Sequence, residues 1–144
     1  MSLPDRNNPY NFDEYLEWRE NFDYYADDPF IQKVVQHFAG DDWERVDHEA
    51  REVSKKASFR WRQMAEAIAY PEKRPYIMHY DGHKHRIDRI VRPLETLQME
   101  KEIFSEALFS EKTSPWLKLV KMFIIYQNGE ACVACPITCT EGMV

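Results

Sequence analysis

The chain has 144 residues, of which 44% are hydrophobic and 14% aromatic, with 19 basic and 25 acidic side chains. This length is enough for one domain with a hydrophobic core. No apolar run approaches the roughly 18 residues that a membrane-spanning helix needs, and the first residues lack the layout of a signal peptide. We therefore expect a soluble, cytoplasmic protein.

Charge is distributed unevenly along the chain. Residues 1–50 carry 4 basic and 13 acidic side chains, residues 51–92 carry 11 and 5, and the remainder carries 4 and 7. We predict that the basic middle forms salt bridges with the acidic first helices. A phosphate-bearing ligand is the alternative, whereas the charge density is too low to favour nucleic acid. The basic group comprises Lys73, Arg74, Lys84, Arg86, Arg89 and Arg92, interleaved with Tyr76 and Tyr80.

The N-terminal third predicts a disordered arm over residues 1–11 and then two helices. The first runs from 12 to about 26, with aromatic residues three or four apart that predict a packing stripe. The second begins at Asp28-Pro29 and ends at Gly40. The expected stripe consists of Phe12, Tyr15, Trp18, Phe22 and Tyr25, and the expected inner face of the second helix of Phe30, Val34 and Phe38.

A long helix is predicted from Asp41 or Asp42 to about Tyr70, where prolines end it. Its apolar residues recur in steps of three and four, so one side faces the core throughout. We expect Ser54 and Ser58 to mark a bend. The apolar positions are Trp43, Val46, Ala50, Val53, Ala57, Trp61, Met64 and Ile68.

The last half predicts a hairpin and two further helices. Asp81-Gly82 is a turn dipeptide between two strand-like runs at 76–91. Pro93 opens a helix to about Phe109, with Leu94, Leu97, Lys101, Phe104 and Leu108 on one face. Ser114 and Pro115 begin a terminal helix that is apolar on nearly every side and therefore buried. The predicted fold is all-α, with about five helices in a bundle and a small β-hairpin, forming one helical domain over 12–144.

Three cysteines and three histidines suggest one alternative function, a metal-binding module. Cys132, Cys135 and Cys139 would share one helix face, and His79, His83 or His85 in the hairpin could supply a fourth ligand. The simpler interpretation is that the cysteines are small packing residues and the histidines are solvent-exposed. A disulfide framework is not expected from an odd number of cysteines in one helical run.

Two stretches resemble the acyl-CoA dehydrogenase flavoenzymes, most closely the branch that includes the bacterial alkylation-response flavoprotein. One is Tyr80-Asp81, then Arg86-Ile87-Asp88, then Pro93 opening a helix. The other is Cys135-Pro136-Ile137-Thr138-Cys139-Thr140, preceded by Gly129. The chain departs from these relatives at Lys84, where they have a glycine, and at Cys139, where they have a methionine. The resemblance covers residues 30–144.

The resemblance implies that this chain is the N-terminal helical domain of a three-domain FAD enzyme of fatty acid metabolism that oxidises acyl-CoA thioesters. The family's catalytic base and flavin domain lie outside these residues, so the isolated piece should be inactive and colourless. Its partners would be the flavin and C-terminal domains and the acyl-CoA substrate. Thr138 and Thr140 are the candidate pocket-facing residues. Thr140-Glu141 resembles the start of the family's flavin-contact motif, but we expect it to continue the helix instead.

A stand-alone helical interaction module is the other alternative. An unpaired helix face would expose an apolar patch, which favours a partner or a homo-oligomer.

Overall fold

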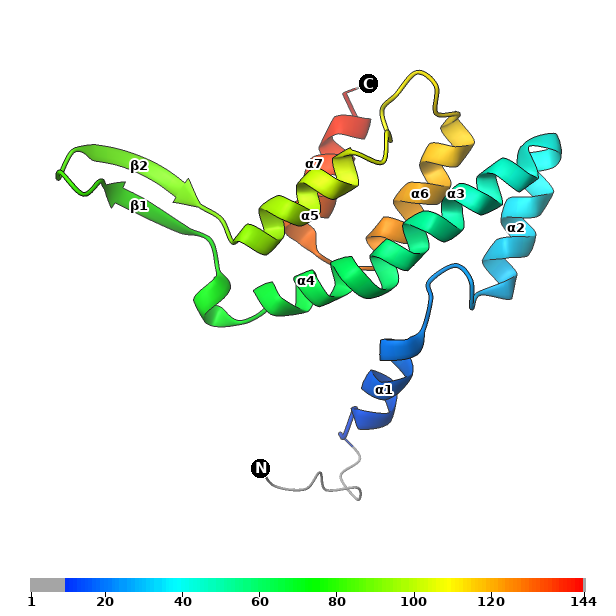
Figure 1. The fold of residues 1–144 in the computed structure, drawn as a ribbon, viewed down its shortest axis with the longest axis horizontal. Coiled ribbons are helices and arrows are strands. Elements are labelled where there is room, and N and C mark those ends of the chain that lie inside the picture. Colours follow the sequence, from blue (N-terminus) through cyan, green and yellow to red (C-terminus); the bar gives the residue numbers. More distant parts are fainter. Residues whose placement is uncertain (1–9, 144) are drawn as a thin grey trace.

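A computed structural model describes residues 10–143, without the side chains of Ala131 and Cys132. Helices surround the core, and a two-stranded hairpin projects from one end of the molecule (Figure 1). The predicted class, mostly α with a small hairpin, is confirmed. Within the described residues, no helix is long and apolar enough to cross a membrane.

One long helical run forms the spine of the domain. It consists of α3 (Trp43–Lys55), a π-helical segment (Lys56–Trp61) and α4 (Arg62–Ile68). The predicted apolar stripe is confirmed. Each π turn holds more residues than an α turn, so the segment changes the helical phase between α3 and α4. The fully buried members of the stripe are Val46, Ala50, Val53, Ala57 and Trp61.

Ser54 and Ser58 lie where the π segment begins and anchor the chain that precedes α2. The Ser54 hydroxyl accepts a hydrogen bond from the backbone N–H of Tyr25 at 2.9 Å and donates to the Asp23 carboxylate at 2.5 Å. The Ser58 hydroxyl accepts from the N–H of Tyr24 at 2.8 Å. All five residues are buried, so this network fixes the loop to the spine.

The first helix, α1 (Asp13–Asn21), is shorter than predicted and buries none of its residues. Phe12, Tyr15 and Trp18 are each more than half exposed, so the predicted packing stripe is wrong over these residues. The Asp23 carboxylate accepts the backbone N–H groups of Tyr25 and Ala26, which holds this segment in a turn. Residues 1–9, which include most of the predicted arm, lie outside the described residues.

The second helix, α2 (Pro29–Ala39), has the predicted bounds, but its inner face is the stripe next to the predicted one, and Val34 is only half-buried. Asp28 caps it by accepting from the N–H groups of Phe30 and Ile31, and Gly40 ends it with φ of 56°. Val35 is buried, whereas Phe30 and Phe38 are 72% and 65% exposed. Apolar residues occupy two adjacent stripes on this helix, and periodicity alone cannot decide which one is covered.

The strands β1 (Tyr76–Tyr80) and β2 (Arg86–Val91) form the predicted hairpin, with Met78 opposite Arg89. The helix after it, α5 (Leu94–Phe104), ends before the predicted Phe109 because the chain turns at Ala107, where φ is 56°. Its predicted face is wrong within α5. The exposed members are Leu94, Leu97, Lys101 and Phe104, and only Leu108, beyond the end of the helix, is buried. The buried residues of α5 are Thr96, Met99 and Ile103.

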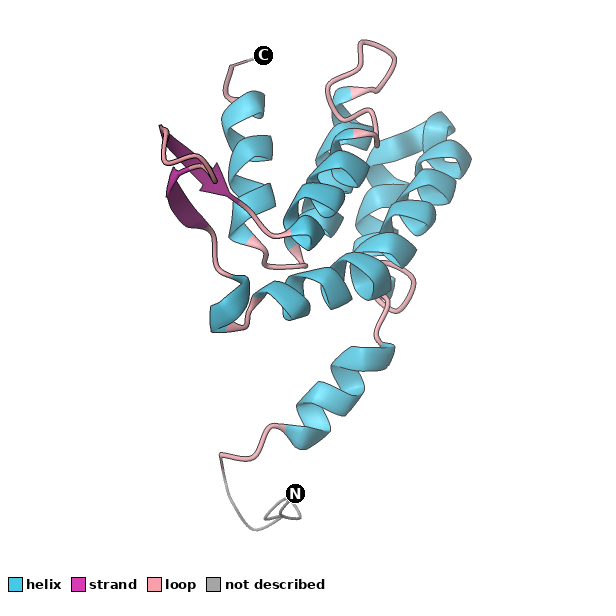
Figure 2. Ribbon diagram, turned by 60° about the vertical axis from the view of Figure 1, so that its left-hand side comes forward, coloured by secondary structure: helices cyan, strands magenta, loops and turns pink. Residues whose placement is uncertain are grey.

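The C-terminal stretch forms two helices, α6 (Pro115–Tyr126) and α7 (Ala131–Glu141). Ser114 caps α6 as predicted, accepting from the N–H of Leu117. Gly129, with φ of 73°, separates the two helices. They run antiparallel, and Lys118 near the start of α6 pairs with Glu141 at the end of α7 at 2.7 Å (Figure 2).

Candidate functional site

The candidate residues Thr138 and Thr140 lie in the second half of α7. Val133 and Ile137 pack into the core and fix the orientation of the helix, so Thr138 is exposed and Thr140 is half-buried. The Thr138 hydroxyl lies 2.9 Å from the Tyr126 hydroxyl and donates to the Ala134 carbonyl at 3.0 Å. Thr138 is therefore held at the surface where α7 meets α6.

The side chains of Thr140 and Glu141 both have bonding partners within this domain. The Thr140 hydroxyl donates to the Pro136 carbonyl one turn earlier, at 2.8 Å, and Glu141 forms the ion pair with Lys118. The expectation that Thr140-Glu141 continues the helix is confirmed, because α7 ends at Glu141. No contact in the structure tests whether Thr138 or Thr140 faces a flavin or acyl pocket, so this assignment remains a prediction.

An apolar stripe runs along the outer side of α6, which is not buried on every side as predicted. Leu119, Phe123 and Tyr126 are 55%, 40% and 37% exposed, at spacings of four and three that place them on one face. Trp116 begins the same face, and its ring contacts that of Phe38 from α2 in a tilted arrangement, with the ring centroids 5.5 Å apart. The hydrogen bond between Tyr126 and Thr138 joins this α6 stripe to the exposed side of α7.

The candidate metal ligands do not gather into a cluster. Among the described residues, no group of three or more His, Cys, Asp or Glu side chains could hold a metal ion. Cys135 and Cys139 are exposed, with their sulfurs 4.0 Å apart, and Cys135 raises the pKa of the Cys139 thiol. His79 and His85 bond to Asp88 and Asp81 within the hairpin, as exposed side chains. The side chain of Cys132 lies outside the described residues.

The first family motif builds the hairpin turn. The Asp81 carboxylate accepts the N–H groups of His83 and His85 at 2.8 and 2.9 Å, and these bonds lower its pKa. Lys84, which stands where the relatives have a glycine, has φ of 65°. Glycine adopts this left-handed conformation without strain, so the relatives' glycine suits the same turn.

Asp88 has a similar structural role in β2. Its carboxylate bonds to the imidazole of His79 and to the guanidinium of Arg86, and these contacts lower the pKa of Asp88. The backbone φ of Asp88 is 41°, at the irregularity in the strand register. The motif residues therefore shape the hairpin.

The predicted salt bridges between the basic middle and the acidic first helices are not formed by the hairpin region. Lys73 pairs with Glu95 at 2.7 Å, Arg92 with Glu100 at 2.9 Å, and Arg86 with Asp88 at 2.7 Å. These partners are neighbours in the chain or in α5. The hairpin projects away from α1 and α2, so its arginines cannot reach the acidic helices (Figure 1).

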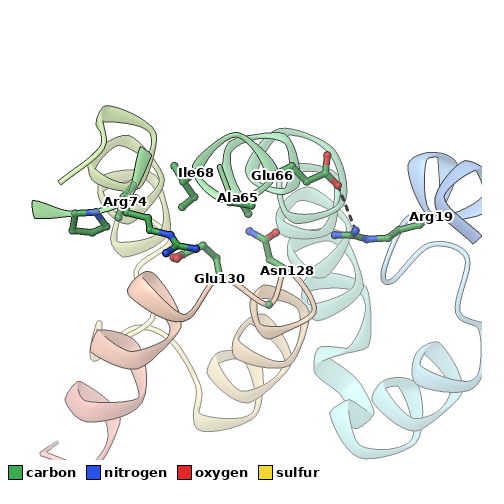
Figure 3. Close-up of a pocket in the computed structure, with 11 residues that line it drawn as sticks. Arg19, Ala65, Glu66, Ile68, Arg74, Asn128 and Glu130 are labelled. Carbon is green, nitrogen blue, oxygen red and sulfur yellow. Dashed lines mark ion pairs between the residues drawn. The ribbon is translucent and has the colours of Figure 1, made fainter. Parts of the chain in front are cut away.

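A groove that the sequence did not reveal lies beside α4. It has a volume of about 470 Å³ and is lined by α4, the start of α5 and the loop between α6 and α7 (Figure 3). An Arg19–Glu66 ion pair of 3.5 Å lies at one end and Arg74 at the other. Asn128 is 7% exposed; its amide nitrogen lies 3.4 Å from the Met99 sulfur, and its oxygen has no protein partner.

A helical domain with a projecting hairpin, whose last helix α7 carries the Cys-Pro-Ile-Thr stretch, has the form expected for the N-terminal part of an acyl-CoA dehydrogenase-like flavoprotein. Comparison with protein families supports this class, because residues 16–144 match the model of the adaptive response protein AidB N-terminal domain. The chain belongs to this family. No match was found among curated proteins or among solved structures.

Proposed function

We propose that this chain serves as the N-terminal helical domain of an acyl-CoA-oxidising FAD enzyme in the cytoplasm, and that its α6–α7 surface packs against the flavin-bearing domain. The family match over residues 16–144 supports the class. The observation that carries the docking surface is the exposed α6 stripe of Leu119, Phe123 and Tyr126, which is joined to Thr138. Contiguous apolar surface of this kind is typical of an interface.

We expect FAD to bind mainly to another domain of the full chain, and not to this piece alone. The sequence contains no glycine-rich phosphate loop. Thr138 offers one exposed hydroxyl, which donates to the Ala134 carbonyl and whose oxygen can accept a hydrogen bond from a neighbouring domain or its ligand. The cofactor would supply the redox chemistry, and this chain would contribute packing and the position of Thr138.

A flavin titration tests the first half of the proposal. The purified 144-residue chain should be colourless and should not quench the fluorescence of added FAD at about 10 μM, a concentration that would detect a Kd of about 1 μM. A stoichiometric flavin spectrum in the isolated chain would contradict the proposal.

Substitution tests the docking surface in a chain that also carries the flavin domain. Leu119→Glu with Phe123→Glu should release the flavin and expose the interface to a hydrophobic dye. Leu94→Glu is the matched control, because Leu94 is an exposed leucine on α5, at 79%. Equal flavin content in all three proteins would show that the α6 stripe is not the interface.

A stand-alone interaction module is the alternative, favoured by the same stripe and its continuation through Trp116 to Phe38. In that case the Leu119→Glu and Phe123→Glu substitutions would abolish binding of a separate protein and leave flavin content unchanged. A metal-binding module is the third candidate, and elemental analysis for zinc and iron in the purified protein tests it.

A further inference from the structure

Two elements project from the domain, α1 and the hairpin (Figure 1). The nine residues of α1 include no buried side chain, and isolated helices this short are marginal in water. A two-stranded hairpin is also marginal unless a helix or another strand packs on it. Neither element covers the other in the same molecule, since they extend in different directions in both views (Figures 1 and 2).

The exposed side chains of α1 are acidic and aromatic. Tyr15 and Trp18 are 53% and 54% exposed, with ring centroids 5.9 Å apart. Among the described residues, the four exposed carboxylates of α1 have no ion-pair partner. These are Asp13, Glu14, Glu17 and Glu20.

The exposed side chains of the hairpin complement those of α1. Tyr76 and Tyr80 lie on one face of β1 and are 56% and 58% exposed. Arg89 lies opposite Met78 on this face, and Lys84 lies at the turn. Within the part of the chain that the structure describes, neither Arg89 nor Lys84 forms an ion pair. The surface is therefore apolar with unneutralised positive charge.

We propose that the hairpin face of one molecule binds α1 of a second copy of this chain, and that the hairpin of the second copy binds α1 of the first. Opposite charge brings the two elements together, and their aromatic side chains exclude water between them. In each contact, α1 of one molecule packs on the hairpin of the other, so both elements gain the packing partner that they lack in the single molecule. The proposal is independent of the α6–α7 surface.

Light scattering of the 144-residue chain between about 10 μM and 1 mM tests for the dimer. We expect a concentration-dependent dimer whose Kd rises about tenfold when the salt concentration is raised from about 0.05 M to 0.5 M, because salt screens exposed charges. A monomer throughout this range, or a dimer indifferent to salt, would overturn the proposal.

Charge reversal identifies the surfaces. The α1 variant, Glu14→Lys with Glu17→Lys, and the hairpin variant, Lys84→Glu with Arg89→Glu, should each be monomeric, because each places like charges in contact. A mixture of the two should form a heterodimer, since both contacts again join opposite charges. Glu44→Lys and Lys33→Glu are controls at exposed positions without ion pairs among the described residues.

Circular dichroism would verify that each variant is folded, which we expect because every substituted side chain is exposed. Restoration of the dimer only in the mixture supports the pairing of α1 with the hairpin. Failure of the mixture to associate, or dimers in either variant alone, would contradict it.

Discussion

The indole nitrogen of Trp61 donates a hydrogen bond to the carboxylate of Glu102 at 2.8 Å. Trp61 is fully buried on the spine, and Glu102 comes from α5, which packs beside it. The same carboxylate pairs with the guanidinium of Arg60 and accepts from the Gln98 amide. Three side chains therefore donate to one carboxylate, two from the spine and one from α5.

These donors lower the pKa of Glu102 to about 2, with the Arg60 hydrogen bond as the largest cause. Because this pKa is lower in the folded protein than in the unfolded chain, the contribution to stability is complete above about pH 5 and is lost as the pH falls toward 2. Urea unfolding from pH 7 to pH 2 should show this loss.

Replacement of Glu102 tests the assignment directly. Glu102→Gln should lower the free energy of unfolding by about 1–2 kcal/mol at pH 7, after allowance for partial solvent screening, and should flatten the acid limb. Glu44→Gln, at an exposed position, should change neither. If the free energy of unfolding of Glu102→Gln falls with acid as steeply as that of the unsubstituted protein, other carboxylates cause the pH dependence.

Ser54 should be essential for the segment that joins α1 to α2. Ser54→Ala removes the hydroxyl that the N–H of Tyr25 and the Asp23 carboxylate share and leaves the N–H of Tyr25 only its bond to that carboxylate, at a cost of about 1–2 kcal/mol. Hydrogen exchange at the Tyr25 amide should accelerate by the corresponding factor. Ser110→Ala, which loses one weak local bond of 3.3 Å, is the control.

Lys121 and Glu49 should respond unequally to substitution. The Lys121 ammonium is buried, lies 2.7 Å from Glu49 and donates to the Glu106 carbonyl at 3.1 Å. Glu49→Ala should cost about 2 kcal/mol because it leaves a buried charge unpaired, whereas Lys121→Met should cost less than about 1 kcal/mol. Thermal unfolding of both variants would show which substitution costs more stability. A larger cost for Lys121→Met would mean that the Lys121 ammonium is solvated.

Gly40 should tolerate no side chain, for a conformational reason alone. Its φ is 56°, and a Cβ at this position would meet no atom within 4 Å. Gly40→Ala should therefore cost about 1–2 kcal/mol through backbone strain. Gly82→Ala, equally unobstructed and without a positive φ, should be nearly neutral. Equal costs at the two positions would show that the positive φ of Gly40 is not the cause.

The sequence predicted where the helices and strands begin and end better than it predicted which helix faces are buried. The caps at Asp28 and Ser114, the end of α2 at Gly40 and the turn at Asp81 follow from local chemistry, and the structure confirms them. The buried face of the spine was also predictable, because its eight apolar positions all lie on one face and no second face is apolar.

The covered faces of the shorter helices depend on contacts that are distant in sequence. Phe30 and Ile31 are both apolar, and only the position of α3 decides that the stripe of Val35 is inside. The end of α1 depends on Asp23, whose partner Ser54 is 31 residues away. The groove beside α4 joins residues from five separate segments, so no local pattern indicates it.

The absence of any buried residue in α1 makes this helix the expected site of limited proteolysis. Because α1 contributes nothing to the core, a protease that cleaves near Arg19 would remove it and leave a resistant fragment that begins at the anchored Asp23–Tyr25 segment. The rate of this cleavage reports whether α1 is free or covered. Limited digestion can therefore follow the state of one terminal helix without disturbing the rest of the domain.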